Sequence, residues 1–73
     1  MIKIGEYDVV RLVRAVTDLG LPAGSKGTVV LAYPDSEPEV VEVEFVDADG
    51  HTTHLATVAT TCLEVVWSAS TNS

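Results

Sequence analysis

The chain is poor in the residues that mark several common classes of protein. Its 73 residues include one cysteine, Cys62, which excludes an internal disulfide framework and is typical of a reducing compartment. No stretch approaches the roughly 20 apolar residues of a membrane-spanning helix. Charged and glycine residues interrupt every apolar run near the N-terminus, so we expect no signal peptide. These absences favour a cytoplasmic protein of a bacterium-like cell.

Basic residues are missing from most of the chain. The formal net charge is −7, and all four Lys and Arg residues lie within the first 26 positions. From Gly27 onward the sequence has eight acidic residues and no Lys or Arg. Binding to nucleic acid without sequence preference depends on Lys and Arg that neutralise phosphates. We therefore expect no direct nucleic-acid partner, and no membrane partner either.

Helical periodicity is also missing, and strands take its place. Val and Thr are abundant, and no window sustains an apolar i, i+3, i+4, i+7 stripe. Strands are predicted over residues 7–16, 28–33, 39–46, 51–58 and 64–67, with a short 3-10 turn over 60–63 before the last strand. This pattern predicts an all-β protein, a single small SH3-like barrel of about five antiparallel strands over residues 1–67. The tail 68–73 has no apolar anchor and is predicted to be disordered.

Side-chain alternation is clearest in the segment 39–46. Val41, Val43 and Phe45 are predicted to face the core, with Glu42 and Glu44 on the solvent side. In the segment 7–16, by contrast, apolar residues of both parities occur, so its inward face is ambiguous.

The segment 17–26 is rich in turn-forming residues and is predicted to be a loop. Its Leu19 and Leu21 are expected to fold back onto the barrel. Ser25 and Lys26 between two glycines suggest a phosphate-binding loop, but the P-loop spacing is missing and a strand follows. The glycines are therefore predicted to shape turns. These turn glycines are Gly20, Gly24, Gly27 and Gly50.

Several short stretches resemble the small bacterial domain of unknown function 4926 family, from Tyr7 to about Val66. They are Asp8-Val9-Val10-Arg11-Leu12, Leu19-Gly20-Leu21-Pro22-Ala23-Gly24, Gly27-Thr28-Val29-Val30, Tyr33, Val43-Glu44-Phe45-Val46, Asp49-Gly50 and Leu63. The Gly-x-x-Gly-Thr-Val turn is also similar to the turn of KOW-type barrels, which supports the SH3-like prediction.

The resemblance implies a stand-alone barrel without assigned catalytic residues. It also implies a gene that sits beside the gene for a second small protein, as in toxin–antitoxin or immunity pairs. The chain departs from the family at Thr60-Thr61-Cys62, where members more often carry acidic residues. A family contact surface that includes this acidic turn would be altered here.

His51, His54 and Cys62 are the candidates for metal binding or nucleophilic chemistry. Residues three apart on a strand point to opposite faces, so the two His rings do not converge on one ion. A structural zinc site needs four ligands, and a reactive thiolate needs an electropositive setting that this half of the chain lacks. Glu42 and Glu44 have no apolar pocket that would prepare one of them for acid–base work. We therefore predict no metal, no cofactor and no enzymatic activity.

Acidic residues are concentrated between positions 37 and 49. One interpretation is a solvated face that keeps the protein soluble and protects a strand edge from pairing. The other is a docking surface for a basic protein, which fits the acidic, antitoxin-like or immunity-like half of a two-gene pair. The residues of this acidic stretch are Glu37, Glu39, Glu42, Glu44, Asp47 and Asp49.

Aromatic residues are few but offer a second kind of binding site. With Phe45 assigned to the core, Tyr7, Tyr33 and Trp67 remain as surface aromatics from three different segments. Converging aromatic rings bind proline-rich peptides or methylated lysine in many small modules. The alternative hypothesis is therefore a module that binds a peptide or small ligand through these rings. The sequence carries no signal for an oligomer.

Overall fold

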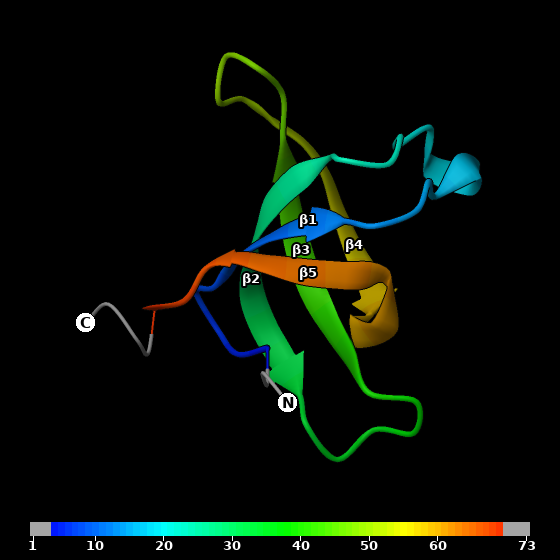
Figure 1. Ribbon diagram of the computed structural model, residues 1–73, viewed down its shortest axis with the longest axis vertical. Helices are drawn as coiled ribbons and strands as arrows, with labels where there is room; N and C mark the ends of the chain where they lie inside the picture. The colour runs from blue at the N-terminus through cyan, green and yellow to red at the C-terminus, as the bar shows by residue number, and fades with distance from the viewer. Residues whose placement is uncertain (1–3, 70–73) are drawn as a thin grey trace.

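The computed structural model describes residues 4–69, which form one antiparallel sheet of five strands (Figure 1). The strands are β1 (Val9–Leu12), β2 (Lys26–Tyr33), β3 (Val40–Val46), β4 (Thr52–Ala59) and β5 (Leu63–Trp67), in the order β4-β3-β2-β1-β5. Two short 3-10 helices are present, η1 (Thr17–Leu19) and η2 (Thr60–Cys62). The predicted all-β class, with five antiparallel strands and a 3-10 turn before the last strand, is confirmed. Within residues 4–69, no helix is both long and apolar enough to span a bilayer.

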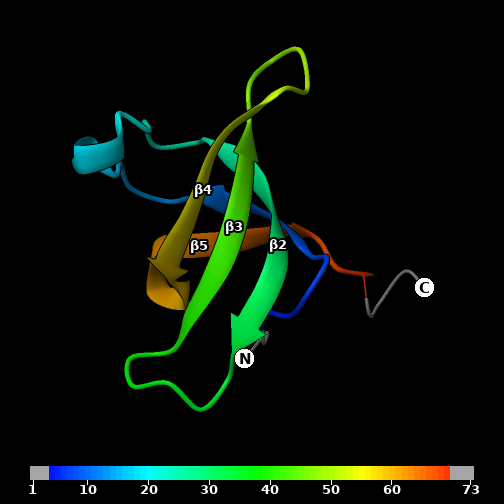
Figure 2. The same ribbon diagram turned by 180° about the vertical axis from the view of Figure 1, so that it is seen from behind.

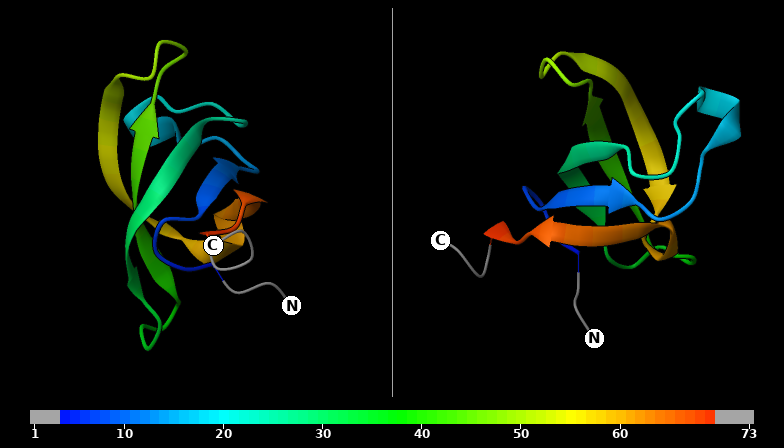
Figure 3. Two further views of the ribbon diagram at one scale, coloured as in Figure 1. Left: turned by 90° about the vertical axis from the view of Figure 1, so that its left-hand side faces the viewer. Right: turned by 45° about the horizontal axis from the view of Figure 1, so that its top comes forward.

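The sheet bends back on itself into two layers. β1 and β5 cross one face of β2, β3 and β4, as Figure 3 shows from two sides. β4 and β5 lie at the two ends of the strand order and do not pair with each other within residues 4–69. The predicted barrel is therefore open between β4 and β5, which η2 connects along the chain.

The hydrophobic core lies between the two layers. Val41, Val43 and Phe45 of β3 are fully buried, which confirms the alternation predicted for this strand. On β1 the buried residues are Val10 and Leu12, so only one of the two candidate parities faces the core. The core residues are Ile4, Val10, Leu12, Leu21, Val29, Val41, Val43, Phe45, Val58 and Leu63.

The first strand is much shorter than the predicted segment 7–16, and the loop after it contains η1. Gly20 ends η1 in the left-handed conformation, with φ of 68°, and its N–H donates to the Thr17 carbonyl. η1 buries none of its residues, so Leu19 is 37% exposed, whereas Leu21 after the turn is buried. The expectation that both leucines fold back onto the core is therefore wrong for Leu19.

Three of the four glycines predicted to shape turns have positive φ: Gly20, Gly24 and Gly50. The prediction was wrong for Gly27. This residue is buried inside β2, directly opposite Phe45 of β3. The close approach of β3, rather than a turn, requires the missing side chain.

The two ends of the described chain meet at Asp8, which is 3% exposed. Its Oδ2 accepts a hydrogen bond from the Gly5 N–H and its Oδ1 accepts one from the Ala69 N–H, each at 2.9 Å. Ala69 belongs to the segment 68–73 that was predicted to be disordered, and here its backbone is held beside the start of β1. Residues 70–73 of that segment lie outside the described residues.

Candidate functional site

β2, β3 and β4 have one face that is turned away from β1 and β5 (Figure 2). Glu42 and Glu44 alternate along β3 with the core residues Val41, Val43 and Phe45, so their side chains lie on this face. Both side chains are half-buried. β3 is a central strand of the sheet, bordered by β2 on one side and β4 on the other. Charges on a central strand cannot guard an edge against pairing. Edge protection, one of the two roles in the solvation interpretation, therefore does not explain these glutamates.

Cross-strand pairing sets apolar side chains beside the two glutamates. Directly opposed residues of an antiparallel pair lie on the same face. Glu42 lies between Leu31 of β2 and Thr57 of β4, and Thr57 Oγ1 donates a hydrogen bond to its carboxylate. Glu44 lies opposite Leu55 of β4. Leu31 is 42% exposed and Leu55 is 62% exposed, so the glutamates stand among accessible apolar side chains.

This surface combines charge and apolar area over three strands. Tyr33 belongs to it as well, because it pairs with Val40 of β3, which shares the parity of the two glutamates. We call this surface the outer face, and it consists of Thr28, Leu31, Tyr33, Glu42, Glu44, Leu55 and Thr57.

The other four predicted acidic residues lie at the two ends of β3. Glu37 and Glu39 precede the strand, and Asp47 and Asp49 belong to the hairpin that follows it (Figure 1). A strand of seven residues is roughly 23 Å long. The acidic residues therefore form a line along the molecule, with Glu42 and Glu44 in the middle, rather than one compact cluster.

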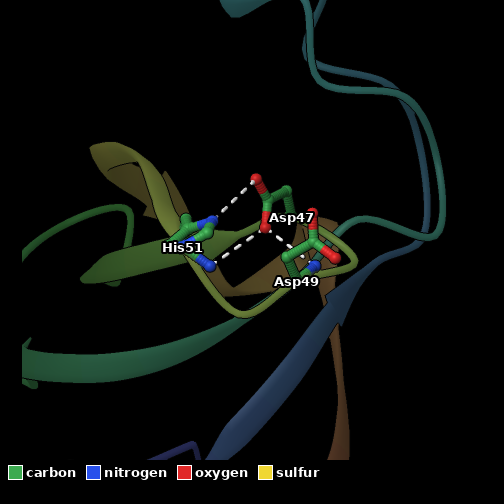
Figure 4. A group of neighbouring side chains, drawn as sticks. All are labelled: Asp47, Asp49 and His51. Carbon is green, nitrogen blue, oxygen red and sulfur yellow. Dashed lines mark hydrogen bonds and ion pairs between the residues drawn. The ribbon is translucent and has the colours of Figure 1, made fainter.

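The hairpin between β3 and β4 brings Asp47, Asp49 and His51 together (Figure 4). One ligand-type atom from each lies within 4.8 Å of the others. Asp47 Oδ1 accepts hydrogen bonds from the backbone N–H groups of Asp49 and His51, each at 2.9 Å, and its Oδ2 lies 3.8 Å from His51 Nδ1. These bonds form an Asx-type turn, which accounts for Asp47 as a structural residue. This trio was not predicted, because His51 was considered together with His54; the spacing Asp-x-Asp-Gly-His was the available signal.

Replacing Asp47 with alanine should lower the free energy of unfolding by about 1 kcal/mol, because two backbone N–H groups lose their acceptor in an exposed hairpin. Asp47→Asn keeps an acceptor oxygen and should retain most of the stability. Urea denaturation measures both. Asp49→Ala is the matched control, with an expected change within about 0.5 kcal/mol, and equal losses for the two alanine variants would contradict the turn role.

His54 and Cys62 have structural surroundings of their own. His54 lies opposite Phe45, and its Nδ1 is 3.1 Å from Thr53 Oγ1. Cys62 is partly buried in η2, where it packs against the core. His51 precedes β4 and Cys62 follows it, so the strand holds these two candidate groups at its opposite ends.

The three predicted surface aromatics are all exposed, but the strand register separates one of them. Trp67 lies opposite Val9, and Tyr7 is two residues before Val9, so both flank the start of β1. Tyr33 is five residues beyond Thr28, the β2 partner of Val9, which is roughly 17 Å along the strand. Tyr33 is therefore part of the outer face, whereas Tyr7 and Trp67 are near the chain ends.

Residues 6–65 match a family model described as Domain of unknown function (DUF4926). The matched segment includes every residue of the outer face, and it agrees with the resemblance seen in the sequence. No curated protein and no solved structure matches the chain.

Proposed function

The chain belongs to the DUF4926 family, and from this premise we propose that it is a non-enzymatic interaction module that binds a basic protein partner through its outer face. The observation that carries the proposal is the position of Glu42 and Glu44 on a central strand, half-buried among exposed apolar side chains. A face kept only for solubility gains nothing from exposed leucines beside its charges.

Mixed surfaces of this kind suit recognition by a protein of opposite charge. Apolar contact contributes to affinity, while complementary charge speeds association and suppresses wrong partners. The line of acidic residues from Glu37 to Asp49 extends the negative potential along the whole of β3. Lys or Arg residues on a partner would therefore meet carboxylates both over the outer face and at its two ends.

Within this proposal the chain is an SH3-like module that acts in the cytoplasm. The strand order β4-β3-β2-β1-β5, with η2 between β4 and β5, supports that architecture. The partner is the product of an adjacent gene, and the chain is the acidic, antitoxin-like or immunity-like half of the pair. Its role is to cover a basic surface of the second protein.

Replacing both Glu42 and Glu44 with lysine should weaken capture of the purified adjacent-gene product by at least about tenfold, because attraction at the centre of the face becomes repulsion. Isothermal titration calorimetry at low and high salt measures the loss. For the original chain, added salt should weaken binding as well, since exposed charge pairs are screened.

A matched control reverses two acidic residues outside the outer face. Glu6→Lys combined with Asp18→Lys changes the net charge by the same amount, and both positions are exposed in the structure. Circular dichroism verifies that both double variants remain folded. Equal binding by the Glu42/Glu44 and the Glu6/Asp18 variants would contradict the proposed face.

A further inference from the structure

The outer face ends at β4, which lies at one edge of the sheet. β4 is the last strand in the sheet order, and within residues 4–69 its only strand neighbour is β3. Natural proteins protect such edges with charged side chains, proline or very short strands. β4 has eight residues, and the sequence from Gly50 to Leu63 contains no Asp, Glu, Lys, Arg or proline. The other edge strand, β5, has five residues and carries Glu64, which pairs with Arg11.

The hydrogen-bond pattern shows which backbone groups of β4 face this open edge. The Thr60 N–H donates to the Glu39 carbonyl at 3.1 Å, which places position 60 on the β3 side. Because sides alternate along an antiparallel strand, positions 58, 56 and 54 also bond toward β3. The N–H and C=O groups of Leu55, Thr57 and Ala59 are therefore directed away from the sheet.

This edge is regular enough to serve as a template. The register of β4 with β3 shifts once, next to Thr53, and is then continuous from His54 to Ala59. The residues whose backbone faces the edge also place their side chains on the solvent side of the sheet, next to Glu42 and Glu44. Leu55, at 62% exposed, is the most accessible of the apolar side chains on the outer face.

We propose that a basic segment of the partner protein adds to the free edge of β4 as a further strand. This inference rests on the proposed function and deepens it by naming the mode of binding. Main-chain hydrogen bonds to an open edge supply affinity in strand addition, and alternate side chains supply specificity. The segment is extended, and it carries Lys or Arg at the alternate positions that share the solvent side with Glu42 and Glu44.

The charge of the chain favours binding of a basic segment of the partner protein over binding of a second copy of the chain. A second copy would bring another net charge of −7 and a β4 strand that contains no Lys or Arg. A strand added to β4 would lie about 10 Å from β3, two inter-strand spacings away. A lysine or arginine side chain can extend across the small Thr57 toward Glu42, with its aliphatic part against Leu55. The edge and the glutamates together therefore favour a basic strand.

The test uses a short synthetic peptide in which lysine alternates with threonine and valine, added to the full isotope-labelled chain. We expect the amide signals of Leu55, Thr57 and Ala59 to shift and their hydrogen exchange to slow. Two isomers are the matched controls, one N-methylated at every lysine and one at every intervening residue, with equal charge. Each isomer loses the N–H donors of one edge of the peptide, so one of them should bind at least about tenfold more weakly than the other.

Equal affinity of the two isomers would overturn strand addition, because it would show that the N–H donors of neither peptide edge contribute to binding. Absence of binding by the unmethylated peptide, or protection of the same amides by raising the concentration of the chain alone, would overturn it as well. None of these outcomes decides the proposed function. Its separate experiment measures binding of the adjacent-gene product to the variant in which Glu42 and Glu44 are replaced with lysine.

A pair of variants tests the same edge from the side of the protein. Thr57→Pro removes an edge N–H without removing a bond to β3, and Thr57→Val removes the same hydroxyl but keeps the N–H. The valine variant should bind the peptide within about twofold of the unsubstituted chain, and the proline variant about tenfold more weakly. Equal binding by two folded variants would contradict the inference. If the proline variant does not fold, the comparison of the two N-methylated peptides tests strand addition instead.

Discussion

Gly27→Ala should lower the free energy of unfolding by about 3 kcal/mol or more, measured by urea denaturation. A Cβ atom at this position would lie 2.6 Å from Val43 Cγ1 and 2.7 Å from the carbonyl oxygen of Glu44. The carbonyl belongs to the neighbouring strand and cannot rotate away, so β2 and β3 would have to separate. That separation would weaken the ladder beneath the outer face and leave a gap in the core beside Phe45, the direct partner of Gly27.

Gly5→Ala is the matched control for this prediction. Among the described residues 4–69, no atom lies within 4 Å of the position where its Cβ would stand, and its φ lies outside the positive range. The same chemical change should therefore alter stability by no more than about 0.5 kcal/mol. Similar stabilities for the two variants would show that β3 does not approach β2 as closely as the structure has it.

The parts of the fold that follow from local sequence pattern were predictable. The period of two in β3 is visible as alternating Val and Glu, because one face of that strand is core and the other is solvent. Asp49-Gly50 marks the hairpin after it, since a glycine accepts the positive φ that the turn requires. The all-β class followed from these patterns alone.

Features that depend on which strands meet were not predictable. The mid-strand role of Gly27 follows from the approach of β3, and nothing in the neighbouring sequence indicates it. Glu42 and Glu44 were identified as a charged strand face, but their place on a central strand follows from the order β4-β3-β2-β1-β5. The same order places β4 at an edge of the sheet. Only there does the lack of Asp, Glu, Lys and Arg in β4 leave the strand open to pairing. Local patterns could not provide that order.

Asp8→Ala should lower the free energy of unfolding by about 3 kcal/mol. Its buried carboxylate accepts hydrogen bonds from the backbone N–H groups of Gly5 and Ala69, which lie 64 positions apart in the chain. Hydrogen bonds to a charged acceptor contribute about 1.5–3 kcal/mol each, and alanine would leave both donors without this partner. No local pattern in the sequence indicated this role, because one of the two donors lies in the segment predicted to be disordered.

Two further variants separate the hydrogen bonds of Asp8 from its charge. Asp8→Asn keeps one acceptor oxygen but turns an NH₂ group toward the second donor, so about half of the loss should remain. Asp35→Ala removes a carboxylate that is exposed and has no hydrogen bond within residues 4–69, and should leave stability within about 0.5 kcal/mol. Amide hydrogen exchange at Ala69 should accelerate in Asp8→Ala and stay unchanged in Asp35→Ala. Unchanged protection of that amide would contradict the contact, since Asp8 is the link through which the start of β1 holds the end of the described chain.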